Sequence, residues 1–378
     1  MLAILILAYS HYVVLTYQFK LRPNPTQEAA LWKTLRLSRE LYNGALAELI
    51  ANYEATGKHM NLFTQDKKHG SKEHPELPAV VVDATLKRLH VSFANFFRRC
   101  KEGADKKGFP RFKGANRWHS IQFRDATSNG ISDSYFKAGK MLGGRIRFNR
   151  HRDIVGVLKF CRIIRKPSGW YLQAVCETKP KEFPKTGLNI GLDFGLKTLV
   201  ADSDGNKVEN PRYLRHSLRK LKIAQRTIAR RKKGSSRRKK ACRVAARIHE
   251  RIANQRGDYL HKVARSYVNR YDNIFIEDLA PANMVRNRAL ARSISDASWA
   301  MLRQLLESKA ASAGKRVVAV PPHYTSQLCS QCGEIVQKAL SVRTHVCPQC
   351  GYSDCRDTNA AKNILQRGDA AFREVVLL

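Results

Sequence analysis

The chain has 378 residues, 43% of them hydrophobic, which suits two or three domains with their own cores and excludes disorder throughout. Lysine and arginine number 69 against 31 acidic residues, and the net charge of +38 predicts a polyanionic partner, with nucleic acid as the first candidate and a membrane surface as the rival. No 18-residue apolar run is present to span a membrane.

The first ten residues, MLAILILAYS, are apolar, but they lack the basic region and cleavage site of a signal peptide. We interpret them as a leading strand or as the product of a start codon placed too far upstream. Nine cysteines, four of them in a metal-binding pattern, favour a reducing cytoplasm over a disulfide scaffold.

The next residues predict one strand and two helices. Residues 11–21 are rich in β-branched and aromatic side chains and predict a strand. Near-helical apolar spacing predicts a helix from Thr26 to about Ala55, with Gly57 as its stop. A polar loop over 58–77 then leads to a second helix over about 78–100.

The segment 101–118 is basic and rich in glycine, and Phe109, Phe112 and Trp118 interleave with its cations. It is either a solvated loop or a surface that stacks bases and contacts phosphates. Residues 119–178 alternate apolar and polar side chains, with turns at Ser128-Asn129-Gly130 and at 167–169, and predict strands. Together with the first strand they predict one small barrel that is interrupted by the helices.

Two strands are predicted over about 188–194 and 196–202, and Asp193 lies inside the first of them. A carboxylate among apolar residues is unfavourable unless a charged group faces it. The alternative is an aspartate on the exposed face of an edge strand.

Residues 215–256 contain 17 lysines and arginines against one acid, Glu250, and predict a basic hairpin of two helices broken at 234–236. So many uncompensated cations favour an anionic partner over a solvated face. The residues expected to contact nucleic acid are Arg219, Lys222, Arg226, Arg230, Arg231, Lys232, Lys233, Arg237 and Arg238.

A short buried strand over 273–279 ends in Glu277 and Asp278, and Pro281 closes it. Asp296 is expected to cap a helix that stops at Gly314, and 316–321 predicts a further strand. This order of strands and helices predicts an α/β sheet with helices packed against it.

Two Cys-x-x-Cys pairs, Cys329/Cys332 and Cys347/Cys350, are separated by fourteen residues. Each pair is followed by a glycine that permits a tight turn. Four thiolates at this spacing predict a structural zinc site, and the alternatives are buried core cysteines or a disulfide.

Asp357 opens the helical run DTNAAKNIL, as an N-cap or as a metal-binding carboxylate. Asp193, Glu277 and Asp357 together form the acidic set expected of an RNase H-like nuclease. Such a cluster repels itself unless it binds cations, and Mg²⁺ prefers oxygen ligands. A pair of Mg²⁺ ions suits phosphodiester hydrolysis.

The motifs GLDFG, IEDL, the cysteine pairs and RDTNAAKNI, in this order, resemble the TnpB family of bacterial insertion sequences, which is related to type V CRISPR effectors. QFKLRPNPTQ and GFPRFKG resemble the family more loosely. The resemblance implies an RNA-guided DNA endonuclease that binds a transposon-end guide RNA, one protein chain per RNA, and cuts double-stranded target DNA beside a short flanking motif. Asp193, Glu277 and Asp357 would be its catalytic magnesium ligands, and the four cysteines its zinc ligands.

The resemblance also implies a multidomain α/β architecture in the bacterial cytoplasm, at the nucleoid when bound to DNA. The expected parts are a wedge-like β-barrel (1–25 and 119–184), a helical recognition domain (26–118), a RuvC-like nuclease domain (185–322 and 353–378) and an inserted zinc module (323–352). The basic helices, 213–256, would grip the heteroduplex.

One departure is Cys355, which occupies a position where many relatives have an acidic residue. It could compete for zinc with the four paired cysteines. Two other functions remain open: a nuclease-inactive regulator that binds DNA with its guide, and a transposase or accessory protein of transposition. The retained acidic residues argue against the first, and the lack of a separate helix-turn-helix or tyrosine nucleophile motif argues against the second.

Overall fold

The computed structural model describes residues 12–70, 73–123, 130–181, 183–339 and 341–376. The apolar start and the turn residues Ser128 and Asn129 lie outside these ranges. The chain forms two compact units, a first unit of Tyr12–Thr178 and a second unit from Lys179 onward. Within the described ranges, none of the helices has the length and apolar content that crossing a bilayer requires.

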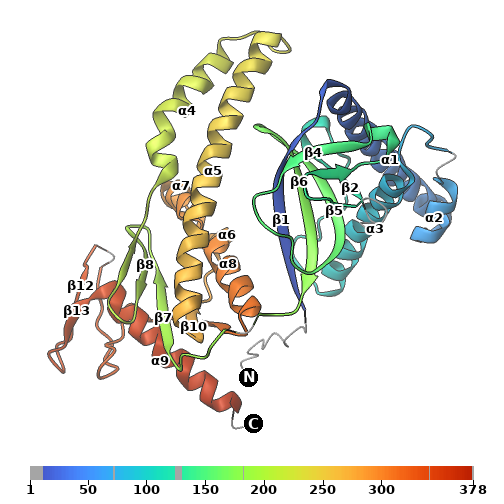
Figure 1. Cartoon of the computed structure of the whole chain (residues 1–378). Coiled ribbons are helices and arrows are strands. Elements are labelled where there is room, and N and C mark those ends of the chain that lie inside the picture. Colours follow the sequence, from blue (N-terminus) through green and yellow to red (C-terminus); the bar gives the residue numbers. More distant parts are fainter. Residues whose placement is uncertain (1–11, 71–72, 124–129, 182, 340, 377–378) are drawn as a thin grey trace. The chain divides into compact units, whose positions relative to one another are not determined.

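The first unit contains one antiparallel sheet in the order β2-β5-β6-β1-β4-β3 (Figure 1). The predicted first strand therefore pairs with strands that follow it by more than a hundred residues, because β1 lies between β6 and β4. The strands are β1 (Val13–Arg22), β2 (Ser120–Phe123), β3 (Tyr135–Lys137), β4 (Arg145–Asn149), β5 (Val157–Lys166) and β6 (Gly169–Thr178).

The helices of the first unit are α1 (Pro25–Thr56), α2 (Leu62–Lys68) and α3 (Ala79–Lys101). Both long predicted helices are confirmed, and Asn24 starts α1 by accepting a hydrogen bond from the backbone N–H of Gln27. The apolar faces of α1 and α3 share one core with the sheet, in which Leu31, Leu89 and Phe19 are fully buried. The short helix α2 falls in the predicted polar loop and was missed.

Trp118 was grouped with the exposed aromatic side chains of the basic segment, and this was wrong. Its indole is buried in the core of the first unit and donates a hydrogen bond to the Ser38 hydroxyl at 2.9 Å. Phe109 and Phe112 are about half exposed, at 47% and 55%.

The second unit contains a five-stranded sheet in the order β11-β10-β7-β8-β9. The first three of these strands run parallel and the last three antiparallel. The strands are β7 (Asn189–Phe194), β8 (Thr198–Asp202), β9 (Lys207–Glu209), β10 (Asn273–Glu277) and β11 (Arg316–Val320). Because β7 is the central strand, the alternative that placed Asp193 on an edge strand is wrong.

The helices of the second unit are α4 (Tyr213–Ala229), α5 (Ser236–Arg270), α6 (Pro281–Met284), α7 (Arg288–Ala297), α8 (Trp299–Ser312) and α9 (Arg356–Val376). Successive residues of a strand point to opposite faces of its sheet. On β10, Ile274 and Ile276 join a core with Tyr267 of α5 and Leu302 of α8, whereas Phe275 packs with Ile364 of α9. Helices therefore cover both faces of this sheet.

The prediction that Asp296 caps a following helix was wrong. Asp296 lies inside α7, and its carboxylate accepts hydrogen bonds from the backbone N–H groups of Leu214 and Arg215 at the start of α4. Asp296 therefore caps a helix that begins 83 residues earlier in the chain, a pairing that local sequence cannot reveal. Pro281, expected only to end a strand, begins α6.

Candidate active site and metal centre

Asp193 and Glu277 lie on adjoining parallel strands at corresponding positions. Leu192 of β7 is in register with Ile276 of β10. The residues that follow them, Asp193 on β7 and Glu277 on β10, therefore lie next to each other. Neighbouring strands are about 4.8 Å apart, and residues in register point to the same face. Both carboxylates therefore emerge side by side at the carboxyl ends of β7 and β10.

Asp357 reaches the same edge of the sheet from the first turn of α9. Two glycines allow α9 to pack closely on the sheet, because there is no room for a Cβ atom at either position. A Cβ on Gly191 would lie 2.1 Å from the carbonyl oxygen of Ala361, and one on Gly368 would lie 2.1 Å from the ring of Phe275. Asp357 is therefore held over the sheet by the close docking of α9 onto β7 and β10.

Glu277 and Asp357 both act electrostatically on Asp193. Burial, together with the charges of Glu277 and Asp357, raises the pKa of Asp193 well above its ordinary value, while Arg356 acts in the opposite direction. Burial also raises the pKa of Glu277, although a hydrogen bond from the Thr325 hydroxyl and the charge of Arg367 oppose the rise. Elevated pKa values are expected where like charges are crowded in a poorly solvated site. We call Asp193, Glu277 and Asp357 the acidic cluster.

Two arginines lie against one member of the acidic cluster. Arg356 contacts the Asp357 carboxylate at 3.1 Å, and Arg343 contacts it at 3.6 Å. The two arginines therefore compensate part of the negative charge of Asp357. Among the described residues, the group of four cysteines is the one set of His, Cys, Asp and Glu side chains whose ligand atoms are close enough to hold a metal ion.

Cys355 and Lys207 adjoin the acidic cluster, and only Cys355 was noted from sequence. Burial acts to raise the pKa of the Cys355 thiol, but the hydrogen bond with Lys207 and the backbone N–H groups of Thr358 and Asp357 lower it below its ordinary value. Cys355 is not part of the group formed by the four paired cysteines. No sequence signal marks Lys207, because β9 is only three residues long.

The four paired cysteines come together in one group, with all four sulfur atoms within 4.8 Å of one another. The Cys329–Cys350 and Cys332–Cys347 sulfur distances are 3.6 and 3.5 Å. The first pair precedes the short hairpin of β12 (Thr344–Val346) and β13 (Ser353–Cys355), the second pair lies in the turn of that hairpin, and β13 leads directly into α9. This group is therefore linked along the chain to the helix that carries Asp357.

The predicted basic hairpin is formed by α4 and α5, which pack along each other (Figure 1). Eight of the nine residues that we expect to contact nucleic acid are exposed. The ninth, Arg238, donates from its guanidinium to the carbonyl oxygens of Ile228 and Arg231. Arg238 therefore helps to close the turn after α4, and its side chain is partly committed to the fold.

Three family models match the chain. Residues 173–288 match a family described as "Probable transposase", residues 299–364 match the "Cas12f1-like, TNB domain", and residues 13–58 match a "Helix-turn-helix domain". In this structure the last of these segments consists of one strand and one long helix, β1 and α1. The other two segments contain Asp193 and Glu277, and Asp357 and the four cysteines, respectively.

The chain is also similar to whole proteins. A Streptomyces pristinaespiralis protein named as a candidate RNA-guided DNA endonuclease is 32% identical, over 94% of this chain and 89% of its own length. The Escherichia coli K12 protein InsQ is named as a candidate for the same activity. It is 31% identical over 94% of this chain and 92% of its own length. The fold is similar to that of Cas12f1 in a complex with single guide RNA and target DNA, with a TM-score of 0.59, 12% identity, and 94% and 99% of the two chains covered.

Proposed function

This chain belongs to the TnpB family of RNA-guided DNA endonucleases, and from that premise we propose that it cuts DNA at sites chosen by a bound guide RNA. The observation that carries the proposal is the convergence of Asp193, Glu277 and Asp357 at one edge of the sheet in the second unit. We assign catalysis to these three residues.

We further propose that the second unit is an RNase H-like, RuvC-type nuclease domain formed by 185–322 and 353–378, with 323–352 as an inserted zinc ribbon. Its mixed sheet supports this, because three antiparallel strands continue into two parallel ones. We also propose a wedge-like barrel (1–25 and 119–184) that is interrupted in sequence by a helical recognition domain (26–118).

The donor set of the acidic cluster fits magnesium, because it consists of carboxylate oxygens whose mutual repulsion a divalent cation would relieve. Asp193, Glu277 and Asp357 would hold the ions. Two bound Mg²⁺ ions supply an activated water and stabilise the leaving oxygen of a phosphodiester.

The surrounding residues orient this cluster. The Thr325 hydroxyl donates a hydrogen bond to Glu277 and so fixes the direction of its carboxylate. Arg343 and Arg356 neutralise part of the charge of Asp357 until cations and the DNA backbone take over that role. Asp193 lies on the central strand, with Glu277 and Asp357 beside it.

The four-cysteine group fits zinc. A tetrahedral site with Zn–S bonds of about 2.3 Å places sulfur atoms about 3.8 Å apart. The Cys329–Cys350 and Cys332–Cys347 sulfur distances, 3.6 and 3.5 Å, are close to that spacing. Zinc would stabilise the module that leads into α9 and would so help to position Asp357.

The net charge and the basic hairpin support binding of a structured guide RNA and of the target DNA. We propose one protein chain per RNA. A nuclease-inactive regulator is less well supported, because all three carboxylates are present. A transposase is the activity named in one family description, whereas the two relatives that match most of the chain are named as candidate RNA-guided DNA endonucleases.

The test is to purify the protein, sequence the RNA that accompanies it, and incubate the complex with DNA that matches the RNA's variable end. With Mg²⁺ the complex should cut matching DNA and leave mismatched DNA intact. A complex that contains a defined RNA and binds matching DNA without cutting it would support the regulator instead. Cutting that is independent of the RNA sequence would refute RNA guidance.

A further inference from the structure

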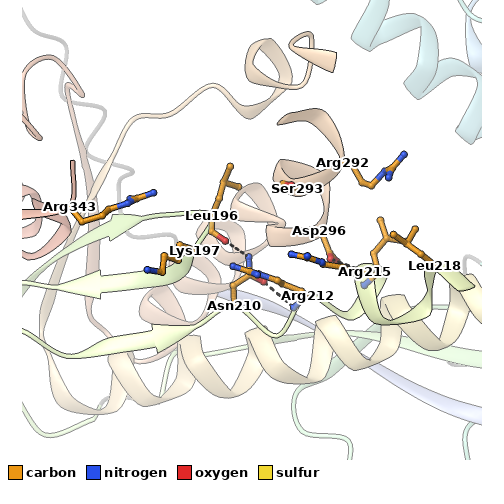
Figure 2. A pocket seen from close by; sticks show the side chains of 11 residues that line it. Leu196, Lys197, Asn210, Arg212, Arg215, Leu218, Arg292, Ser293, Asp296 and Arg343 are labelled. Carbon is orange, nitrogen blue, oxygen red and sulfur yellow. Dashed lines mark hydrogen bonds between the residues drawn. The ribbon is translucent and has the colours of Figure 1, made fainter. Parts of the chain in front are cut away.

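A cavity of about 440 Å³ in the second unit is lined by side chains from the β7–β8 turn, the segment between β9 and α4, α4 itself, α7 and the residues before β12 (Figure 2). This volume is within the range of pockets for small ligands, roughly 300–1,000 Å³. Its charged lining residues are Lys197, Arg212, Arg215, Arg292, Arg343 and Asp296. We call it the arginine pocket.

Among the described residues that line the arginine pocket, the one carboxylate, Asp296, already has hydrogen-bond partners. The Asp296 side chain, 8% exposed, accepts a hydrogen bond from Arg256 at 2.8 Å and two more from the backbone of α4. Within the described residues, Lys197, Arg212, Arg215 and Arg292 make no ion pair. The lining therefore carries an excess of positive charge that an anion would compensate.

Arg212 is held in place by the backbone around it. It has a φ of 46°, in the left-handed region that residues other than glycine rarely adopt. Its N–H donates to the Asn210 side chain at 3.1 Å, and the Asn210 amide in turn donates to the carbonyl oxygen of Leu196 at 3.0 Å. Strained residues of this kind are found where a side chain is preorganised for a ligand.

The arginine pocket adjoins the acidic cluster through two elements. Arg343 lines the pocket and also contacts Asp357 at 3.6 Å. Lys197 lies four residues after Asp193, on the turn that ends β7. In Figure 2, Lys197 and Arg343 lie on one side of Leu196, and Arg215 and Arg292 lie on the other.

We propose that the arginine pocket binds the sugar-phosphate backbone of the DNA strand that the acidic cluster cuts, an inference that rests on the proposed function. Guanidinium groups are well suited to phosphate oxygens, which they bind by paired hydrogen bonds. A phosphate held here, on groups linked to Asp357 and Asp193, sets the position of the scissile phosphodiester. The link through Arg343 favours the cut DNA strand over the guide RNA as the occupant.

The test combines protein and DNA changes in the guide-loaded complex. Single phosphates near the cut site are replaced by uncharged methylphosphonates, and single-turnover cutting is measured with the wild type and with Arg212→Gln/Arg292→Gln. The wild type should be slowed at one or two of these positions. The variant should cut ordinary DNA roughly tenfold slower or worse, as loss of charged hydrogen bonds predicts, and should not be slowed further at those positions.

Arg288→Gln is the matched control, because it lies one turn earlier on α7 and outside the pocket. It should behave as the wild type. Arg292→Gln alone changes an exposed side chain and should show a smaller effect in the same direction with an unchanged melting temperature. If cutting by the double variant is slowed by the same methylphosphonates as cutting by the wild type, the inference is wrong. If the double variant loses its guide RNA, the inference is also wrong, because the pocket then binds RNA. In either case the proposed function stands if the wild type cuts guided DNA and Asp193→Ala does not.

Discussion

Replacing Gly191 by alanine tests whether the close docking of α9 positions the acidic cluster. The new Cβ would lie 2.1 Å from the Ala361 carbonyl oxygen and 2.7 Å from the Leu365 backbone nitrogen, whereas real Cβ contacts essentially never fall below 3.0 Å. Both neighbours are backbone atoms of α9, so no side chain can rotate away. The helix and the strand must separate by about 1 Å, which is a case of overpacking.

Two effects of Gly191→Ala follow from that separation. Overpacking costs about 1–3 kcal/mol, which for a unit of this size lowers the melting temperature by roughly 2–12 °C. Because Asp357 moves with α9, and a misplacement of about 1 Å costs roughly a hundredfold in rate, guided cutting should fall by about that factor. Thermal unfolding and single-turnover cutting by the RNA-loaded protein measure the two effects.

Gly257→Ala is the control for Gly191→Ala. Its Cβ would meet only the Met301 methyl at 3.5 Å, an ordinary contact, and alanine is the better helix former inside α5. Stability and cutting should be unchanged or slightly higher. If Gly191→Ala keeps both the wild-type melting temperature and the wild-type rate, α9 does not position Asp357 in the way described.

Three further predictions concern zinc, charge and pH. Cys347→Ser should lower the zinc content from about one ion per chain and destabilise the module before α9, as metal analysis and thermal unfolding would show; a wild type that is folded and free of metal would end the zinc assignment. Reversing the charges of Arg230, Arg231, Lys232 and Lys233 should flatten the salt dependence of RNA affinity, and an unchanged slope would mean that these exposed residues do not touch phosphate. Because the pKa of Asp193 is raised in the folded state, its contribution to stability without metal is present at low pH and lost as pH rises through that pKa. In EDTA, Asp193→Asn should therefore become more stable than the wild type as pH increases, and Mg²⁺ should reduce the difference; a pH-independent difference would contradict this.

The sequence predicted most of the long elements because each has a clear period. The apolar residues of α1 recur at helical spacing, and the strands of the first unit alternate. The short elements α2, β3 and β9 were missed, because three to seven residues carry too little periodicity.

For the candidate site, the sequence predicted which residues take part, but it did not predict how they are arranged in space. An aspartate inside an apolar strand and paired cysteines are local signals, so Asp193 and the four cysteines could be selected. The cap that Asp296 provides to α4, the burial of Trp118 and the arrangement of the arginine pocket depend on contacts between distant segments. Gly191 gave no sign of its role, since only the packed helix shows why a side chain is excluded there.

The most direct test of the central claim is guided DNA cutting by alanine variants of the acidic cluster. Asp193→Ala, Glu277→Ala and Asp357→Ala should each abolish cutting while RNA and target binding survive, and a double variant should be no worse than a single one, because groups that hold the same ions act as a unit. Asp278→Ala, which removes an exposed carboxylate paired with Arg303, should keep most of the activity. An Asp193→Ala protein that is folded, loaded with RNA and still cuts at the wild-type rate would contradict the assignment.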